Sequence, residues 1–130
     1  MIGVNIEIGR TCVPYHLPPD SPNLRMLMAT VNADQRERYL TPYVQKGTVS
    51  AIGISEPGAG ADPAAMITRA VRDGDEWVIN GRKIWISRAQ EADFTILMAV
   101  TDKQKGARGG ISAFLIDKGT PGFNVLRRIP

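Results

Sequence analysis

The segment that decides the fold lies at positions 75 to 87 and reads Asp75-Glu76-Trp77-Val78-Ile79-Asn80-Gly81-Arg82-Lys83-Ile84-Trp85-Ile86-Ser87. Two short runs rich in Ile, Val and Trp stand on either side of the Asn80-Gly81 pair. Asn-Gly favours the positive φ angles of a tight two-residue turn. The segment therefore predicts a β-hairpin whose strands are residues 76–79 and 83–86.

Runs of the same kind continue outward from this segment. From Thr48 onward, short stretches rich in Ile, Val, Trp and Phe alternate with Gly, Pro and Asp turns, which is typical of antiparallel β structure. We expect two further strands at 94–100 and 111–116, joined by a glycine-rich basic loop. Thr120-Pro121-Gly122 predicts a turn into a last segment, residues 123–129.

The residues before Gly47 follow a helical pattern instead. Ser21-Pro22 predicts a helix start, because the serine hydroxyl accepts a first-turn N–H and proline at the first position loses no needed donor. Apolar residues then recur at helical spacing and predict one buried stripe: Leu24, Leu27, Met28 and Val31. A second short helix is expected after Asp34, with Leu40 on its inner face and Pro42 at its end. Residues 1–20 are interpreted as irregular.

Length and composition predict one folded unit. The chain has 130 residues, 43% of them hydrophobic, which is enough apolar material for a single core. We divide it into a helical lead-in, residues 1–46, and a β domain, residues 47–130. The expected fold class is mainly β.

Charge and cysteine content exclude several classes of function. The 16 basic and 13 acidic residues are spread along the chain, so nucleic acid is not an expected partner. The basic stretch 103–108 is interpreted as a solvated loop, with a phosphate-attracting patch left open. Cys12 and His16 are the only residues of their kinds, which excludes an intrachain disulfide and a Cys/His zinc site. No apolar run approaches the roughly 20 residues of a membrane span, so we expect a soluble, cytoplasmic protein.

Two familiar motifs are only partly matched. Gly53-Ile54-Ser55-Glu56-Pro57 nearly spells the G-x-S-x-G turn of serine hydrolases, but its fifth residue is wrong and no triad can be defended. Gly58-Ala59-Gly60-Ala61-Asp62 begins like a dinucleotide-binding G-x-G-x-x-G but lacks the third glycine and a surrounding βαβ unit. Its two glycines still allow a backbone to approach an anion such as a pyrophosphate. A surface turn without a ligand remains the alternative.

Trp85 and Ser87 lie two apart on a predicted strand, so their side chains would project from the same face. An indole beside a hydroxyl suits a flat heteroaromatic ring that needs stacking and one polar contact. The alternative interpretation is a core tryptophan and a serine at a strand end.

Together these motifs closely resemble the central signatures of the acyl-CoA dehydrogenase family. The resemblance covers residues 34 to 130 and rests on several motifs in the right order: Ile54-Ser55-Glu56-Pro57-Gly58-Ala59-Gly60-Ala61-Asp62, the stretch 73–87, Ala92-Asp93, Phe114-Leu115-Ile116 and Gly119-Thr120-Pro121-Gly122-Phe123. Several spaced motifs are far more specific than any one of them.

The resemblance implies an antiparallel β-barrel, preceded here by short α-helices, that carries much of an FAD site between two helical domains. It assigns the cofactor-binding roles as follows: Ile52, Ile54 and Ser55 line the flavin, Gly60 and Ala61 approach the pyrophosphate, Trp85 packs on the isoalloxazine, and Ser87 offers its hydroxyl near flavin N5. Position 61 is alanine where the family commonly has serine, which puts a side-chain hydrogen bond in doubt. Positions 55 and 87 carry serine where threonine is frequent, which we expect to matter little.

The reaction implied by the resemblance is the FAD-dependent oxidation of the CH–CH group of an acyl-CoA. In relatives the catalytic base comes from a C-terminal helical domain, to which nothing here corresponds, so no catalytic and no metal-binding residue is assigned. We interpret Glu56 and Asp62 as ion-paired or turn-capping. The isolated chain is expected to be inactive and to bind FAD weakly, with the missing helical domains and a homo-oligomer completing the enzyme. A non-catalytic remnant or interaction module, or a flavin oxidase or monooxygenase of the same superfamily, remain alternatives.

Overall fold

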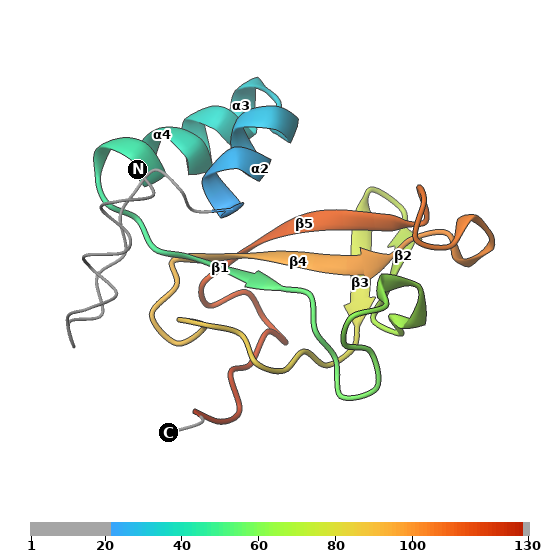
Figure 1. Cartoon of the computed structure of the whole chain (residues 1–130). Helices are drawn as coiled ribbons and strands as arrows, with labels where there is room; N and C mark the ends of the chain where they lie inside the picture. The colour runs from blue at the N-terminus through green and yellow to red at the C-terminus, as the bar shows by residue number, and fades with distance from the viewer. Residues whose placement is uncertain (1–21, 129–130) are drawn as a thin grey trace, which may run out of the picture.

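The protein is built on a five-stranded mixed sheet with short helices on one face, as the computed structural model shows for residues 22–128 (Figure 1). The strands are β1 (Ser50–Gly53), β2 (Arg69–Asp73), β3 (Glu76–Asn80), β4 (Phe94–Val100) and β5 (Ile111–Asp117). The strands expected at 94–100 and 111–116 are therefore confirmed, and the mainly β class with them. The predictions made for residues 1–20 lie outside the described residues.

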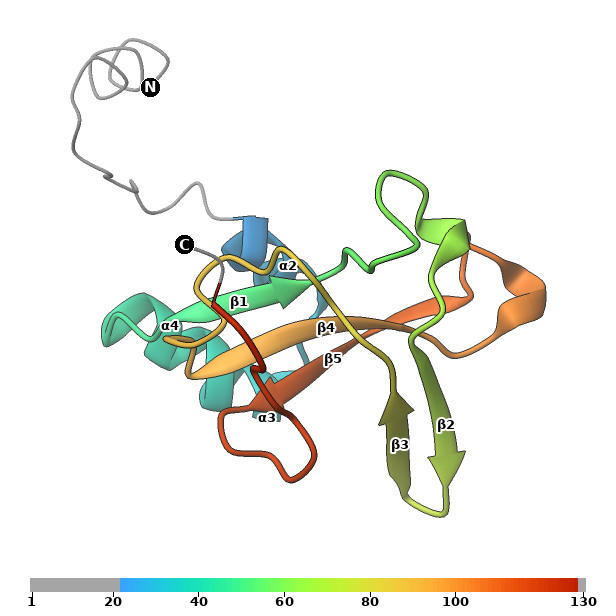
Figure 2. The same ribbon diagram turned by 90° about the horizontal axis from the view of Figure 1, so that it is seen from below.

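Strand β4 organises the sheet. It pairs antiparallel with β5 over its whole length and parallel with β1, where Ser50 faces Phe94. The purely antiparallel prediction is thus wrong for β1, because the long connection through residues 54–93 lets the chain return in the same direction. Strand β2 meets β4 at one residue pair only, Arg69 and Val100, so the β2–β3 hairpin projects from the sheet (Figure 2). Among the described residues the sheet is open, and a barrel is not confirmed.

The predicted hairpin around Asn80-Gly81 is wrong. Strand β3 pairs with β2, in register from Arg69 opposite Asn80 to Asp73 opposite Glu76, and the turn lies at Gly74, whose φ is +59°. The Asp73-Gly74 step provides the left-handed conformation that a tight turn needs, and it competes successfully with Asn80-Gly81. Residues 81–86 form no strand. The strand face that was to carry Trp85 and Ser87 therefore does not exist.

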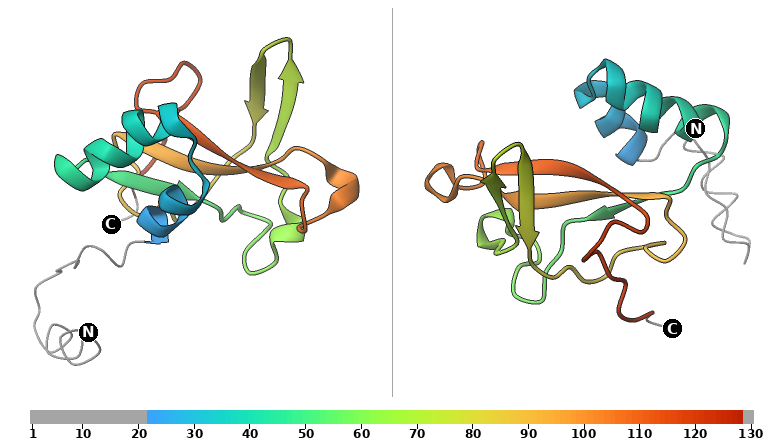
Figure 3. Two further views of the ribbon diagram at one scale, coloured as in Figure 1. Left: turned by 90° about the horizontal axis from the view of Figure 1, so that it is seen from above. Right: turned by 180° about the vertical axis from the view of Figure 1, so that it is seen from behind.

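Helix α2 (Pro22–Thr30) begins at the expected proline, while Ser21 lies outside the described residues. Its inner face differs from the predicted stripe at one position, since Met28 is 60% exposed. The second helix is longer than predicted: α3 (Ala33–Gln35), the π-helical η1 (Arg36–Leu40) and α4 (Thr41–Gln45) follow one another without a break (Figure 3).

Pro42 does not end this helix. The N–H of Thr41 bonds to the carbonyl of Arg36, five residues back, so the turn before the proline is wider than an α turn. A widened turn accommodates a ring that would otherwise clash with the carbonyl four residues earlier. The helix ends at Gln45 instead, two residues before Gly47, whose φ is +68°.

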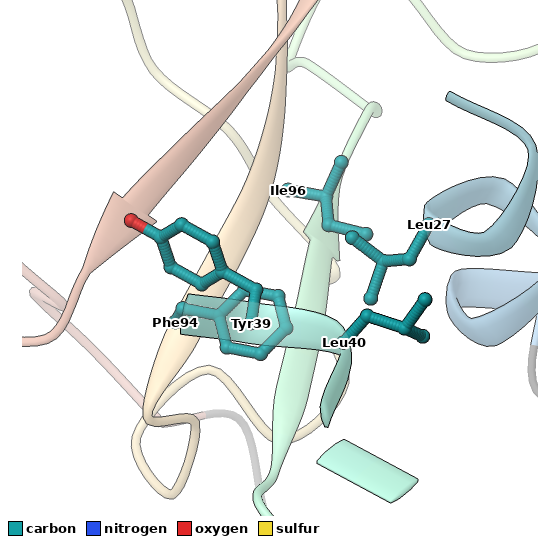
Figure 4. Packing of buried hydrophobic residues seen from close by; sticks show 5 residues of the cluster. All are labelled: Leu27, Tyr39, Leu40, Phe94 and Ile96. Atoms are coloured by element: carbon teal, nitrogen blue, oxygen red, sulfur yellow. The ribbon is translucent and has the colours of Figure 1, made fainter. Parts of the chain in front are cut away.

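One core joins the helices to the sheet. Figure 4 shows its buried residues, which come from α2, η1 and β4: Leu27, Tyr39, Leu40, Phe94 and Ile96. The rings of Tyr39 and Phe94 meet edge to face, with centroids 5.1 Å apart.

The division of the chain into a helical lead-in and a β domain at residue 46 remains a prediction. No helix within residues 22–128 is long and apolar enough to cross a membrane, and the cytoplasmic location also remains a prediction.

Candidate functional site

The loop that follows β1, residues 54–62, begins with a closed turn. The backbone N–H of Glu56 bonds to the carbonyl of Ala59 at 3.0 Å, and the N–H of Ala59 bonds back to Glu56 at 3.2 Å. Asp62 then caps the short 3₁₀ helix η2 (Pro63–Ala65) by accepting the N–H of Ala64 at 2.9 Å. The interpretation of Asp62 as a capping residue is confirmed. Gly60 and Ala61 lie exposed between the turn and the helix.

Glu56 is buried beneath this turn. Its carboxylate forms an ion pair with Lys83, whose Nζ lies 2.8 Å from Oε1, and the side chains of Glu56 and Lys83 are 0% and 8% exposed. The backbone N–H groups of Ile67 and Thr68 also donate to the carboxylate, at 2.8 and 3.0 Å. Glu56 is thus ion-paired, as expected.

These contacts set the protonation state of Glu56. Burial acts against ionisation and would raise the pKa. Hydrogen bonds from the side chains of Lys83 and Thr68, and from the backbone of Ile67 and Thr68, outweigh it and lower the pKa to about 2. A carboxylate that is ionised, inaccessible and fully bonded is poorly suited to abstract a proton from a substrate.

The segment after β3, residues 81–87, lies against the start of the 54–62 loop. The N–H of Ile84 donates to the carbonyl of Ser55 at 2.9 Å, and Nζ of Lys83 donates to the carbonyl of Ile54 at 3.1 Å. Two segments that are 29 positions apart in the sequence are therefore held side by side.

Trp85 follows directly after this contact and is 70% exposed. Its φ is +59°, a conformation that bulky residues rarely adopt. A residue held in such a strained conformation costs about 1–3 kcal/mol and often marks a functional segment. Ser87 lies exposed in the turn that comes next.

The remaining predicted residues lie on β1 and on the loop that follows it. Ile52 sits on β1, half-buried against the core, and Ile54 is 39% exposed. Ser55 is half-buried and bonded through its carbonyl to Ile84. The structure therefore brings the backbone of Ile54 and Ser55 next to the segment that carries Trp85. Gly60 and Ala61 belong to the same loop.

Three residues were not predicted from the sequence to belong to this site: Lys83, Thr68 and Gly81. A Cβ at Gly81 would lie 2.2 Å from Oγ1 of Thr68, so this glycine is needed for a close approach rather than for a turn. Thr68 is buried and bonds through its carbonyl to Val100. No local pattern links these positions, because their partners are 12 or more residues away in the sequence.

The site is an exposed surface rather than an enclosed pocket. A cleft of about 190 Å³ lies elsewhere, between the turn 89–92 and Phe123. A wider one of about 460 Å³ lies between η1 and β5, beside Trp77. The predicted residues line neither cleft. An indole, hydroxyls and an open glycine-containing turn are groups that could provide one wall for a flat, anionic ligand.

A family model and the sequences of known proteins both match this chain, and both indicate the same family. Residues 51–130 match the family model described as acyl-CoA dehydrogenase, middle domain. The chain is 42% identical over 124 residues to (R)-benzylsuccinyl-CoA dehydrogenase of Thauera aromatica, covering 95% of this chain and 30% of that protein.

Solved structures agree with this match. Butyryl-CoA dehydrogenase from Megasphaera elsdenii superposes with a TM-score of 0.73 at 37% identity, over 78% of this chain and 26% of that one. The FAD complex of PigA superposes with a TM-score of 0.77 at 36% identity, over 82% and 28%. The chain thus spans less than a third of the length of these relatives.

Proposed function

Since this chain belongs to the acyl-CoA dehydrogenase family, whose middle domain it matches, we propose that it forms one wall of an FAD site. The complete protein would be an oxidoreductase acting on the CH–CH group of an acyl-CoA thioester. The observation that carries the proposal is the contact between Ile84 and Ser55, which places an exposed, strained Trp85 beside the loop 54–62.

The open space around this loop is compatible with FAD. Nothing lies within 4 Å of the positions that a Cβ would take at Gly58 and Gly60, so a ligand can approach the backbone there. Ile52, Ile54 and Ser55 would line the flavin, while Gly60 and Ala61 would approach the pyrophosphate through their backbone. Trp85 would pack on the ring, and Ser87 would offer its hydroxyl at the ring edge.

These roles determine what FAD, this chain and the rest of the protein would each contribute to the reaction. FAD supplies the redox chemistry when bound, and the residues of this chain bind and orient it. Because Glu56 is buried and ion-paired, we propose that the base comes from a helical domain outside this chain. The isolated chain would then be inactive and bind FAD weakly. Closure of the sheet into a barrel, the flanking domains and a homo-oligomer are parts of the same proposal.

Calorimetric titration with FAD tests the proposal, using both this chain and the chain joined to the helical domains that flank it. We expect weak binding by the chain alone, and tight binding with acyl-CoA oxidation by the longer protein. Trp85→Ala should weaken FAD binding about fivefold or more, as expected for loss of a stacking contact. Trp77→Ala is the matched control, since Trp77 packs on Phe114 at 5.5 Å, outside the candidate site.

Two outcomes would refute parts of this proposal. Tight stoichiometric FAD binding by the isolated chain would contradict the need for other walls. Equal effects of the two tryptophan substitutions would contradict the assignment of Trp85.

A further inference from the structure

The buried pair Glu56–Lys83 connects the two halves of the candidate site. The stem of Lys83 passes over Gly53, where its Cγ lies 3.5 Å from the position that a Cβ would take. Its ammonium group then reaches Oε1 of Glu56 at 2.8 Å and the carbonyl of Ile54 at 3.1 Å. Lys83 is therefore fixed both by packing along its stem and by two bonds at its tip.

Glu56 extends the connection to a third segment. Its carboxylate accepts the N–H groups of Ile67 and Thr68, which precede β2. Thr68 is itself bonded through its carbonyl to Val100 at the end of β4, at 2.8 Å. The pair thus links the 54–62 loop and the 81–87 segment to the central strand of the sheet.

The packing around Thr68 leaves little freedom at this junction. Its side chain is buried and interacts with the Glu56 carboxylate. Gly81 approaches so closely that even a methyl group there would meet the hydroxyl.

Stability alone does not explain why two charges are buried here. Replacing a buried ion pair by apolar residues of similar size is often neutral or stabilising, whereas removing one partner is strongly destabilising. A pair whose joint replacement would change stability little still fixes the relative positions of the groups that it bonds.

We propose that the Glu56–Lys83 pair is a positioning device that sets the distance between the Ser55 loop and the segment carrying Trp85 and Ser87. The positioning itself is a property of this chain, and its effect on a ligand rests on the proposed function. The pair contacts no reacting group, so neither residue is assigned a catalytic role.

Amide hydrogen exchange in the full 130-residue chain tests the positioning directly. The double variant Glu56→Gln/Lys83→Met removes both charges and leaves no unpaired charge buried, so it should fold. The Ile84 amide, bonded to Ser55, should exchange about 10- to 100-fold faster, the factor expected for loss of a charge-assisted hydrogen bond. Amides of β4, such as that of Leu97, should keep their rates.

A matched control removes an exposed ion pair from the neighbouring turn. Nε of Arg88 lies 3.4 Å from Glu91, and both side chains are at least half exposed. Arg88→Met/Glu91→Gln should leave exchange at Ile84 unchanged, because exposed pairs contribute little. The single variant Lys83→Arg keeps the charge and should retain most of the protection that the double variant loses.

FAD affinity supplies the second measurement, in the longer protein joined to its helical domains. If the competent arrangement falls to about a tenth of the population, FAD should bind the double variant about tenfold more weakly at an unchanged melting temperature. Unchanged exchange at Ile84, or equal acceleration throughout the sheet, would overturn the positioning role. If the wild type binds FAD and the double variant binds it with the same affinity, the positioning role is overturned as well. If the wild type binds no FAD, the proposed function fails, while the exchange rates still decide the positioning role.

Discussion

The buried carboxylate of Glu56 makes the stability of this protein depend on acid in a specific way. The pKa of Glu56 falls from an ordinary value of 4.5 to about 2 in the folded state. A depressed pKa contributes stability that is present above the unfolded value and is lost as the pH falls through the folded value. The relevant window is therefore pH 4.5 to 2.

The magnitude follows from the size of the shift. About 2.5 pKa units at 1.36 kcal/mol each correspond to about 3 kcal/mol in total. By linkage, about 2 kcal/mol of this is already lost at pH 3, because the unfolded chain is then protonated while the folded one is not. This is a large fraction of the stability of a small domain.

Urea unfolding of the wild type and of Glu56→Gln, at several pH values from 6 to 2, measures the effect. Other carboxylates titrate equally in both proteins, so the difference in unfolding free energy isolates Glu56. We expect the wild type to be the more stable protein at pH 6, and the gap to shrink by about 2 kcal/mol at pH 3. A gap that stays constant over this range would refute the interpretation of Glu56 as a buried, ionised partner of Lys83.

Three further predictions follow from packing and burial. Gly81→Ala should destabilise the fold by about 1–3 kcal/mol in urea unfolding, because its methyl group would meet Thr68, whereas Gly58→Ala, with open space around it, should be nearly neutral. Phe94→Ala should cost about 3–5 kcal/mol in the same assay, because the ring is 3% exposed and packs edge to face on Tyr39. Burial, together with the nearby Asp117 carboxylate, raises the pKa of Tyr39, so stability should be lost as the pH rises above 10. Tyr39→Phe should abolish that loss when urea unfolding is measured at several pH values above 9.

The clearest sequence predictions concern segments whose pattern is local. The strands expected at 94–100 and 111–116 are present, the second one residue longer, since β-branched and aromatic runs bounded by turn residues favour extended structure wherever they pack. Helix α2 begins at Pro22 for an equally local reason. The family signatures were also readable, because they are short motifs in a fixed order. Whether the candidate residues bind FAD stays a prediction.

Pairing was decided by the tertiary structure. Asn80-Gly81 and Asp73-Gly74 are both good turn sequences, and the chain uses only the second, because β3 then pairs with β2 and leaves Gly81 to approach Thr68. A propensity scale ranks each turn separately and contains no information about which neighbour will be present. For the same reason, Pro42 as a helix end was a reasonable local prediction and a wrong one.

By itself, the sequence determined the mainly β class, the family and the places of most strands, because these depend on composition, periodicity and motifs within a few residues. Only the folded chain determined that Lys83 reaches Glu56 and that the segment of Trp85 lies against Ser55. These contacts join residues 27 or more positions apart, and the energy of a buried ion pair exists only once the surrounding chain has excluded water.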